Sequence, residues 1–194
     1  TKLLEKIDLK KIIQKECFLD HHESLFHWDK HNINNATCVH IDAHHDLYTM
    51  DISDWDIPYN YRGNYIGVGN YLFRAMYEGS ISRVCWVIPD WLTKENARLD
   101  LIKNIGKGLS DKVKIINLDE LDLKNKKIFL TISISPEWVP NFLDKEIRQF
   151  LINLKFEKNK IASLEKNLIS RRGGKDYIEN PLPYRFKFPY RIKE

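Results

Sequence analysis

Apolar residues gather in six short runs along the chain. Each run is too short for a helix, and several are apolar without alternation, which is typical of strands buried on both faces. The predicted strands span residues 16–19, 37–41, 83–88, 113–118, 128–135 and 161–164.

Three stretches between these runs carry helical spacing. We predict helices over 69–78, which Gly79 ends, over 93–107, with Thr93 as N-cap, and over 141–157, where apolar residues form one stripe. The alternation of strand and helix predicts an α/β protein, a three-layer α/β/α sandwich around a mainly parallel sheet. In such sheets functional residues collect at the carboxyl ends of the strands.

The length of 194 residues, 43% of them apolar, favours one domain over residues 1–170 followed by a basic aromatic arm over 171–194. We find no apolar window long enough for a membrane span and no apolar block of a signal peptide at the start. The three cysteines are widely spaced within apolar runs, which indicates buried thiols in a reducing compartment. We therefore expect a cytoplasmic protein with no membrane contact.

The net charge of +4 comes from the arm, which holds seven Lys/Arg against three Asp/Glu. Its alternation of basic and aromatic residues could bind an anionic partner or another subunit, or pack on its own domain. Nucleic-acid binding is not expected, because no recognition motif accompanies the charge. If the arm binds another subunit, the protein would form a homo-oligomer.

Candidate chemistry follows the second predicted strand, in the segment Asp42-Ala43-His44-His45-Asp46. In an extended backbone, residues 42, 44 and 46 project to the same side. Two carboxylates and an imidazole that converge there would favour a divalent cation, and mixed oxygen and nitrogen ligands suit Mn²⁺, Fe²⁺ or Zn²⁺ better than Ca²⁺. Solvated loop histidines beside ordinary carboxylates are the alternative.

A second polar cluster, residues 20–23, follows the first predicted strand and includes His21, His22 and Glu23. If the two strands are neighbours, the two clusters lie side by side. A histidine from this cluster could then complete the ligand set.

These segments resemble the arginase, agmatinase and deacetylase superfamily, whose hallmark is a histidine on an earlier loop followed by Asp-Ala-His-x-Asp. Within it, the stretches 19–25, 40–47 and 70–91 are similar to a small branch of peptide arginases, which convert arginines of ribosomal precursor peptides to ornithine and urea. The resemblance covers most of residues 16–170. It implies that His21, Asp42 and Asp46 hold one metal, while His44 and the bridging Asp42 serve a second.

The resemblance fails at a later strand, which ends Asp-x-Asp in the superfamily. Here that stretch carries Ser133 and Ser135, followed by Glu137. Two aspartates, Asp42 and Asp46, neutralise only one divalent cation, and serine hydroxyls are weak ligands. We expect one or two ions, with Mn²⁺ as the first candidate; Glu137 or Glu23 could turn inward, and the serines could simply fill a buried strand.

The resemblance also implies a substrate-binding carboxylate, and Glu165 would stand at the carboxyl end of the last predicted strand. A carboxylate can pair bidentately with guanidinium. The alternative is a helix with an exposed Glu165. Asn70 could orient substrate or cap the following helix, and the second use is favoured.

The expected function is metal-dependent hydrolysis of arginine in a precursor peptide. Asp46 would be ligand and proton acceptor, Glu165 would orient the guanidinium, and His45 or His22 would return the proton. The superfamily's proton-shuttling histidine would fall near Ile66, where this chain has none. A deacetylase-like amide hydrolase with one metal and an inactive peptide-binding scaffold are the rival hypotheses.

Overall fold

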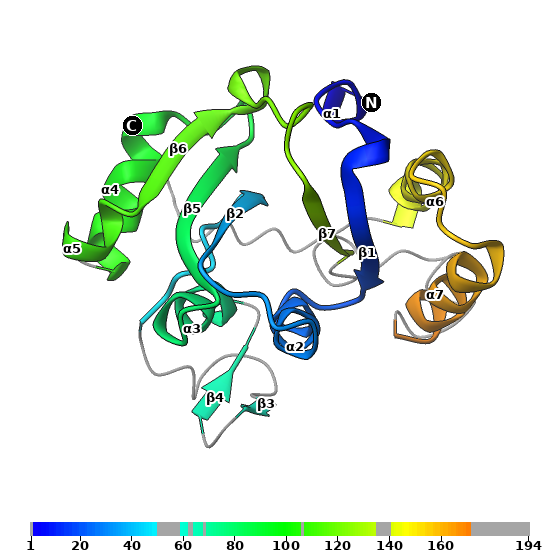
Figure 1. The fold of residues 1–194 in the computed structure, drawn as a ribbon, viewed down its shortest axis with the longest axis horizontal. Helices are drawn as coiled ribbons and strands as arrows, with labels where there is room; N and C mark the ends of the chain where they lie inside the picture. The colour runs from blue at the N-terminus through cyan, green and yellow to red at the C-terminus, as the bar shows by residue number, and fades with distance from the viewer. Residues whose placement is uncertain are drawn as a thin grey trace. The chain divides into compact units, whose positions relative to one another are not determined.

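The computed structural model describes residues 2–49, 59–61, 64–67, 69–105, 107–134 and 141–171. The chain divides into two compact units, Thr1–Ile134 and Ser135–Glu194. Each unit is described by itself (Figure 1).

The first unit holds its main strands in two sheets, and every strand pair within them is parallel. The three-stranded sheet has the order β2-β5-β6, and the two-stranded sheet pairs β1 with β7. A short antiparallel pair, β3 with β4, stands apart from both. The strand bounds are β1 Ile12–Phe18, β2 Ala36–Ile41, β3 Tyr59–Tyr61, β4 Asn64–Ile66, β5 Ile81–Ile88, β6 Val113–Asn117 and β7 Ile128–Ser133.

The register brings the carboxyl ends of neighbouring strands level with one another. At the end of β2, Ile41 pairs with Val87 of β5. At the end of β1, Phe18 pairs with Ser133, the last residue of β7. The loops that follow β1 and β2 therefore leave the carboxyl ends of their strands, where a functional site was expected.

Helices connect these strands and pack against them (Figure 1). Among the described elements, α3 contacts β5, α4 contacts β6, and α2 contacts both β7 and α3. The helices of the first unit are α1 Lys2–Glu5, η1 Leu9–Lys11, α2 Glu23–Lys30, α3 Tyr71–Tyr77, α4 Lys94–Ile105, α5 Lys107–Ser110 and η2 Leu118–Glu120.

The core lies on both faces of the three-stranded sheet, because side chains alternate along β5. Val84, Trp86 and Ile88 join the larger cluster with buried residues of α2, α3 and α4. Val87 points to the smaller cluster with Ile116 and Leu121. The α/β class with parallel strands is therefore confirmed, and it is consistent with a three-layer α/β/α sandwich.

The second unit is helical where it is described, with η3 Asn141–Leu143, α6 Asp144–Asn153 and α7 Lys158–Arg171. The helix predicted to reach residue 157 ends at Asn153, because Lys155 adopts a φ of 59°, which an α-helix does not allow. Helices α6 and α7 contact each other. The Nε of Arg148 on α6 lies 2.9 Å from Oε1 of Glu165 on α7.

The strand predicted over residues 161–164 is wrong, because these residues belong to α7. Ile161, Leu164 and Leu168 are the buried residues of this helix, at the spacing of three and four that defines one helical face. A four-residue window was too short to separate this period from that of a strand. The bounds of the other five predicted strands lie within four residues of the observed bounds, although Ser135 lies outside the described residues.

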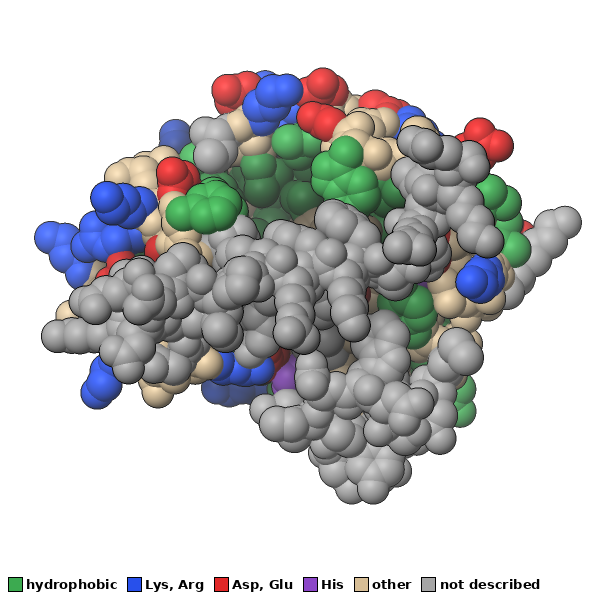
Figure 2. Space-filling model, turned by 180° about the vertical axis from the view of Figure 1, so that it is seen from behind, with side chains coloured by type: hydrophobic (Ala, Val, Ile, Leu, Met, Phe, Trp, Pro, Cys, Tyr) green, Lys and Arg blue, Asp and Glu red, His purple; other side chains and the backbone are tan. Residues whose placement is uncertain are grey.

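Within the described ranges, no helix combines the length and apolarity needed to cross a membrane. Acidic, basic and apolar side chains intermingle on the described part of the face in Figure 2. Several large apolar residues are exposed, among them Ile13, Ile41, Tyr77, Trp91 and Leu99. The three cysteines are free thiols.

Helix α4 offers a matched test of the core. Leu101 is fully buried in the larger cluster, whereas Leu99 on the same helix is 62% exposed. We expect Leu101→Ala to lower the free energy of unfolding by about 2–5 kcal/mol, because it removes buried methyl groups and leaves a cavity. Leu99→Ala should change it by less than about 0.5 kcal/mol. Urea denaturation measures both, and equal losses would contradict this core.

Candidate metal centre

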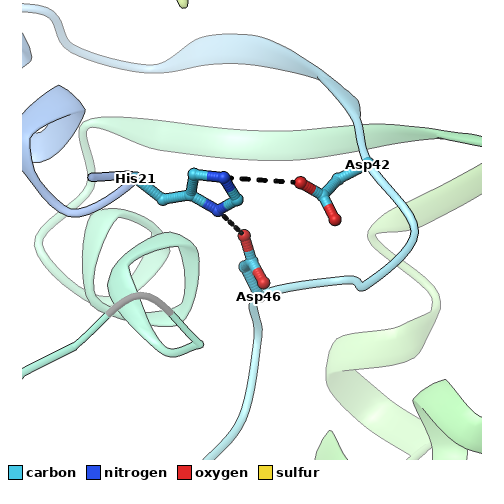
Figure 3. A group of neighbouring side chains, drawn as sticks. All are labelled: His21, Asp42 and Asp46. Carbon is cyan, nitrogen blue, oxygen red and sulfur yellow. Dashed lines mark hydrogen bonds and ion pairs between the residues drawn. The ribbon is translucent and has the colours of Figure 1, made fainter. Parts of the chain in front are cut away.

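Three side chains from two loops converge beyond the ends of β1 and β2. His21 stands in the turn that follows β1, and Asp42 and Asp46 stand in the segment that follows β2. One ligand atom of each lies within 4.8 Å of the others. Figure 3 shows the imidazole of His21 facing both carboxylates. Its Nδ1 lies 2.9 Å from Oδ2 of Asp46, and its Nε2 lies 3.5 Å from Oδ2 of Asp42.

The backbone turns sharply between the two aspartates. The N–H of His44 donates to Oδ1 of Asp42 at 2.9 Å, a local bond that Asp side chains form readily in turns. Asp46 then adopts a φ of 50°, in the left-handed region. Residues held in that region often mark functional sites, because the surrounding structure must enforce the conformation.

Neighbouring elements hold this segment in place. The indole N–H of Trp86 on β5 donates to the carbonyl of Asp42 at 2.9 Å. The N–H of Leu72 on α3 donates to the carbonyl of Asp46 at 3.2 Å. Leu47, fully buried, anchors the segment in the larger core cluster. These contacts with β5, α3 and the core therefore hold the segment that carries the two carboxylates.

Asp46 is buried, with 4% of its surface exposed, and its charge needs compensation. Burial by itself would raise the pKa of this carboxyl group. Hydrogen bonds from His21 and His40, and the charges of both rings, outweigh burial and lower the pKa to about 2. Asp46 is therefore ionised at neutral pH, as a metal ligand must be.

Opposing effects also act on His21. Burial would lower its pKa, but the hydrogen bond to Asp46 and the charges of Asp46, Asp42 and Asp20 raise it above the ordinary 6.5. The site therefore attracts positive charge, whether on a protonated imidazole or on a cation.

The residues present fit one divalent cation. A first-row cation holds nitrogen and oxygen ligands at about 2.0–2.2 Å, so two ligand atoms lie at most about 4.4 Å apart. The triad within 4.8 Å needs to close by only a few tenths of an ångström. The two carboxylates carry two negative charges, which neutralise one such ion. The donor set of His21, Asp42 and Asp46 is the set that the sequence predicts for one metal.

His44 is not among the three residues of this group, and its implied role beside Asp42 at a second ion stays a prediction. It was also expected to project to the same side as Asp42 and Asp46. The prediction assumed an extended backbone, but β2 ends at Ile41 and the turn that follows directs His44 to solvent. Its side chain is 58% exposed, and its Nδ1 lies 3.6 Å from Oδ1 of Asp42. The hydrogen bond and charge of Asp42 raise the pKa of His44 against the effect of burial.

His45, the predicted proton donor, is fully buried beneath the site. Its Nδ1 accepts the N–H of Leu47 at 3.0 Å, and its Nε2 lies 3.5 Å from Oδ2 of Asp100 on α4. Burial lowers the pKa of His45 to about 4, although Asp100 and Asp46 act in the opposite direction. A neutral imidazole with this bond braces the segment that carries Asp46.

The cluster after β1 contributes one ligand. His22 is buried at the start of α2, where its ring lies 6.0 Å from that of Phe26. Glu23 begins α2, and neither residue belongs to the triad. The hydroxyl of Ser133 donates to the carbonyl of Asp20 at 3.3 Å, so this serine steadies the turn that presents His21.

The remaining residues predicted for the site are Glu165, Asn70, Ser135 and Glu137. Glu165 is on α7 of the second unit, where it is partly exposed and paired with Arg148, so the strand end that would have presented it does not exist. Asn70 precedes α3 but makes no side-chain cap bond to it; its Oδ1 accepts the N–H of Gly67 at 2.9 Å. Asn70 therefore occupies the N-cap position of α3, as favoured, without the side-chain bond of a cap. Ser135 and Glu137 lie outside the described residues.

Two residues that the sequence analysis did not single out, His40 and Tyr71, touch the site. Nε2 of His40 lies 3.4 Å from Oδ2 of Asp46, and the hydroxyl of Tyr71 lies 3.4 Å from Nδ1 of His40. His40 lies two residues before Asp42 on β2, so the two-residue period of a strand could have found it. Tyr71 gave no such signal, because only the packing of α3 brings it near.

No family model, curated protein or solved structure matches this chain.

The pairing of His21 with Asp46 predicts a pH dependence of stability in protein stripped of metal by a chelator. The stabilisation from His21 is complete below its unfolded pKa of 6.5 and is lost as the pH rises through its higher folded pKa. We expect the free energy of unfolding to fall as the pH rises above about 6.5, and Asp46→Asn to flatten that fall. Asp111→Asn, an exposed carboxylate paired with Arg98, is the control. Parallel pH profiles for wild type and Asp46→Asn would contradict the pairing.

The triad predicts one equivalent of divalent cation. Calorimetric titration of stripped protein with Mn²⁺, and separately with Zn²⁺, should give a stoichiometry near one. Substitutions of residues that support metal ligands typically lower metal affinity by roughly 10–100-fold. Asp46→Asn should lower the affinity by more than that, because it removes a ligand and a charge. Asp111→Asn should bind like wild type, and equal affinity for both variants would rule out the triad.

Proposed function

We propose that this protein is a metal-dependent hydrolase that converts arginine residues of a ribosomally made precursor peptide to ornithine and urea. The convergence of His21, Asp42 and Asp46 carries the hydrolytic part of the proposal. The arginine substrate rests on the resemblance of residues 40–47, together with the upstream His21, to the peptide arginases. Mn²⁺ is the metal that we propose.

The residues of the triad have separate tasks in this reaction. A divalent cation held there would lower the pKa of a water molecule and supply a nucleophile at neutral pH. Asp42 and Asp46 provide the charge that holds the cation, and Asp46 is the first acceptor of the water's proton. That oxygen would form a bond to the guanidinium carbon. Collapse of the resulting tetrahedral intermediate would break the bond from that carbon to the side-chain nitrogen, which takes up the returned proton. The amine stays on the peptide and urea leaves.

His44 now suits proton return better than His45. Its imidazole is exposed beside Asp42, at 3.6 Å, whereas His45 is buried and bonded to the backbone of Leu47. We assign Glu165 no role in this reaction, because it stands on a helix and pairs with Arg148.

The two negative charges of the triad balance a single divalent cation, which favours a second candidate, a deacetylase-like amide hydrolase. Members of that class work with a single metal, and the carboxylates of Asp42 and Asp46 balance one divalent ion. The two candidates differ in their products, because an amide hydrolase releases acetate from an acylated amine and an amidinohydrolase releases urea.

Mass spectrometry separates these candidates. After incubation of the full chain with Mn²⁺ and arginine-containing peptides, we expect a loss of about 42 Da per modified arginine, as hydrolysis to ornithine requires. Urea should appear in equal amount. Asp46→Asn should abolish both signals, and Asp111→Asn should retain them.

Acetate release from acylated amines without urea would replace the first proposal by the second. A third result would be that neither urea nor acetate appears and that the protein binds less than a tenth of an equivalent of Mn, Fe, Co or Zn. That result would favour a peptide-binding scaffold. Substitution of Asp42 or Asp46 would then leave peptide binding unchanged.

A further inference from the structure

A chain of buried polar groups leads from helix α3 to the carboxylate of Asp46. The hydroxyl of Tyr71, the first residue of α3, lies 3.4 Å from Nδ1 of His40. Nε2 of His40 lies 3.4 Å from Oδ2 of Asp46 and 3.0 Å from the carbonyl oxygen of His44. Tyr71, His40 and Asp46 are all buried.

The contacts of His40 define the direction of each hydrogen bond. A carbonyl oxygen only accepts, so the Nε2 that faces the carbonyl of His44 carries the hydrogen and also points it at Asp46. In the neutral imidazole Nδ1 is then the acceptor, and the hydroxyl of Tyr71 donates to it. The Tyr71 hydroxyl therefore donates to Nδ1 of His40, and the Nε2–H of His40 donates to the carbonyl oxygen of His44 and to Oδ2 of Asp46.

The same turn of α3 holds Asp46 a second time. The N–H of Leu72, next to Tyr71, donates to the carbonyl of Asp46 at 3.2 Å. The first turn of the helix thus controls both the backbone and the side chain of a residue whose φ of 50° is uncommon outside glycine. Leu72 is fully buried in the larger core cluster, so the anchor itself is rigid.

We propose that Tyr71 and His40 are positioning residues of the metal centre, which orient the Asp46 carboxylate through a directed pair of hydrogen bonds. Polar groups behind a metal ligand fix its orientation and raise affinity. The proposal rests on the metal centre of the proposed function and not on its arginine substrate. His21 and His40 both approach Oδ2 of Asp46. Without His40, one hydrogen-bond partner of this oxygen is lost, and the carboxylate can rotate away from the cation position between His21, Asp42 and Asp46.

Tyr71→Phe is the sharpest variant, because it removes one hydroxyl and retains the buried ring. Tyr77→Phe makes the same chemical change on the same helix at an exposed position. We expect Tyr71→Phe to raise the Kd for Mn²⁺, and separately for Zn²⁺, by about tenfold or more. Tyr77→Phe should bind like wild type. Isothermal titration calorimetry on the full chain, with circular dichroism to check folding, measures the ratio.

Variants of His40 supply a second readout. His40→Gln retains an N–H that can point at Asp46, whereas His40→Leu removes every polar group. We expect the glutamine variant to lose less affinity than the leucine variant, an order that loss of packing alone would not produce. Long-range ¹H–¹⁵N spectra of chelator-treated wild type at pH 8 should show the His40 ring with its hydrogen on Nε2.

Three results would overturn the proposal. They are equal metal affinity for Tyr71→Phe and Tyr77→Phe, a hydrogen on Nδ1 of His40, and wild-type protein that binds neither metal. Urea release plays no part in these measurements. A protein that binds metal with the expected ratios but releases no urea would refute the arginine substrate and leave the positioning role standing.

Discussion

The buried charge of Asp46 is the constraint on which the site depends. A carboxylate with 4% exposure would be strongly unfavourable in isolation, and here it remains ionised because His21 and His40 approach it. His21 comes from the turn after β1, and His40 comes from β2. Compensation of one charge therefore ties the ends of two strands from different sheets to each other, and α3 completes the arrangement through Leu72.

The segment after β2 serves the core and the site at once. His45 and Leu47 are fully buried, while Asp42 and Asp46 face His21. A protein interior is packed closely, so a segment whose alternate residues are fixed in the core has little freedom at the residues between them. Asp46 lies between these two buried residues, and the indole N–H of Trp86 holds the carbonyl of Asp42. Both carboxylates therefore have defined positions, which lowers the entropic cost of binding a cation.

Charge sets the limit on what this site holds. Two carboxylates and one imidazole suit a single divalent ion. Ser133, the last residue of β7, hydrogen-bonds the carbonyl of Asp20. That bond gives the serine a structural use in the turn that presents His21. A one-metal centre is compatible with hydrolysis of a guanidinium or of an amide, because either reaction needs an activated water and a proton acceptor.

The sequence by itself determined the α/β class and the places of five strands, since the apolar period is a local property. The resemblance of its motif to a known superfamily pointed to His21, Asp42 and Asp46. The tertiary structure decided what depends on distant contacts. A local turn exposes His44 outside the triad, and the packing of α3 brings Tyr71 to His40 beside Asp46. The buried helical stripe of Ile161, Leu164 and Leu168 places Glu165 on a helix and not at a strand end. Four residues carry too little periodicity to separate strand from helix, and no local pattern encodes which helix packs behind a ligand.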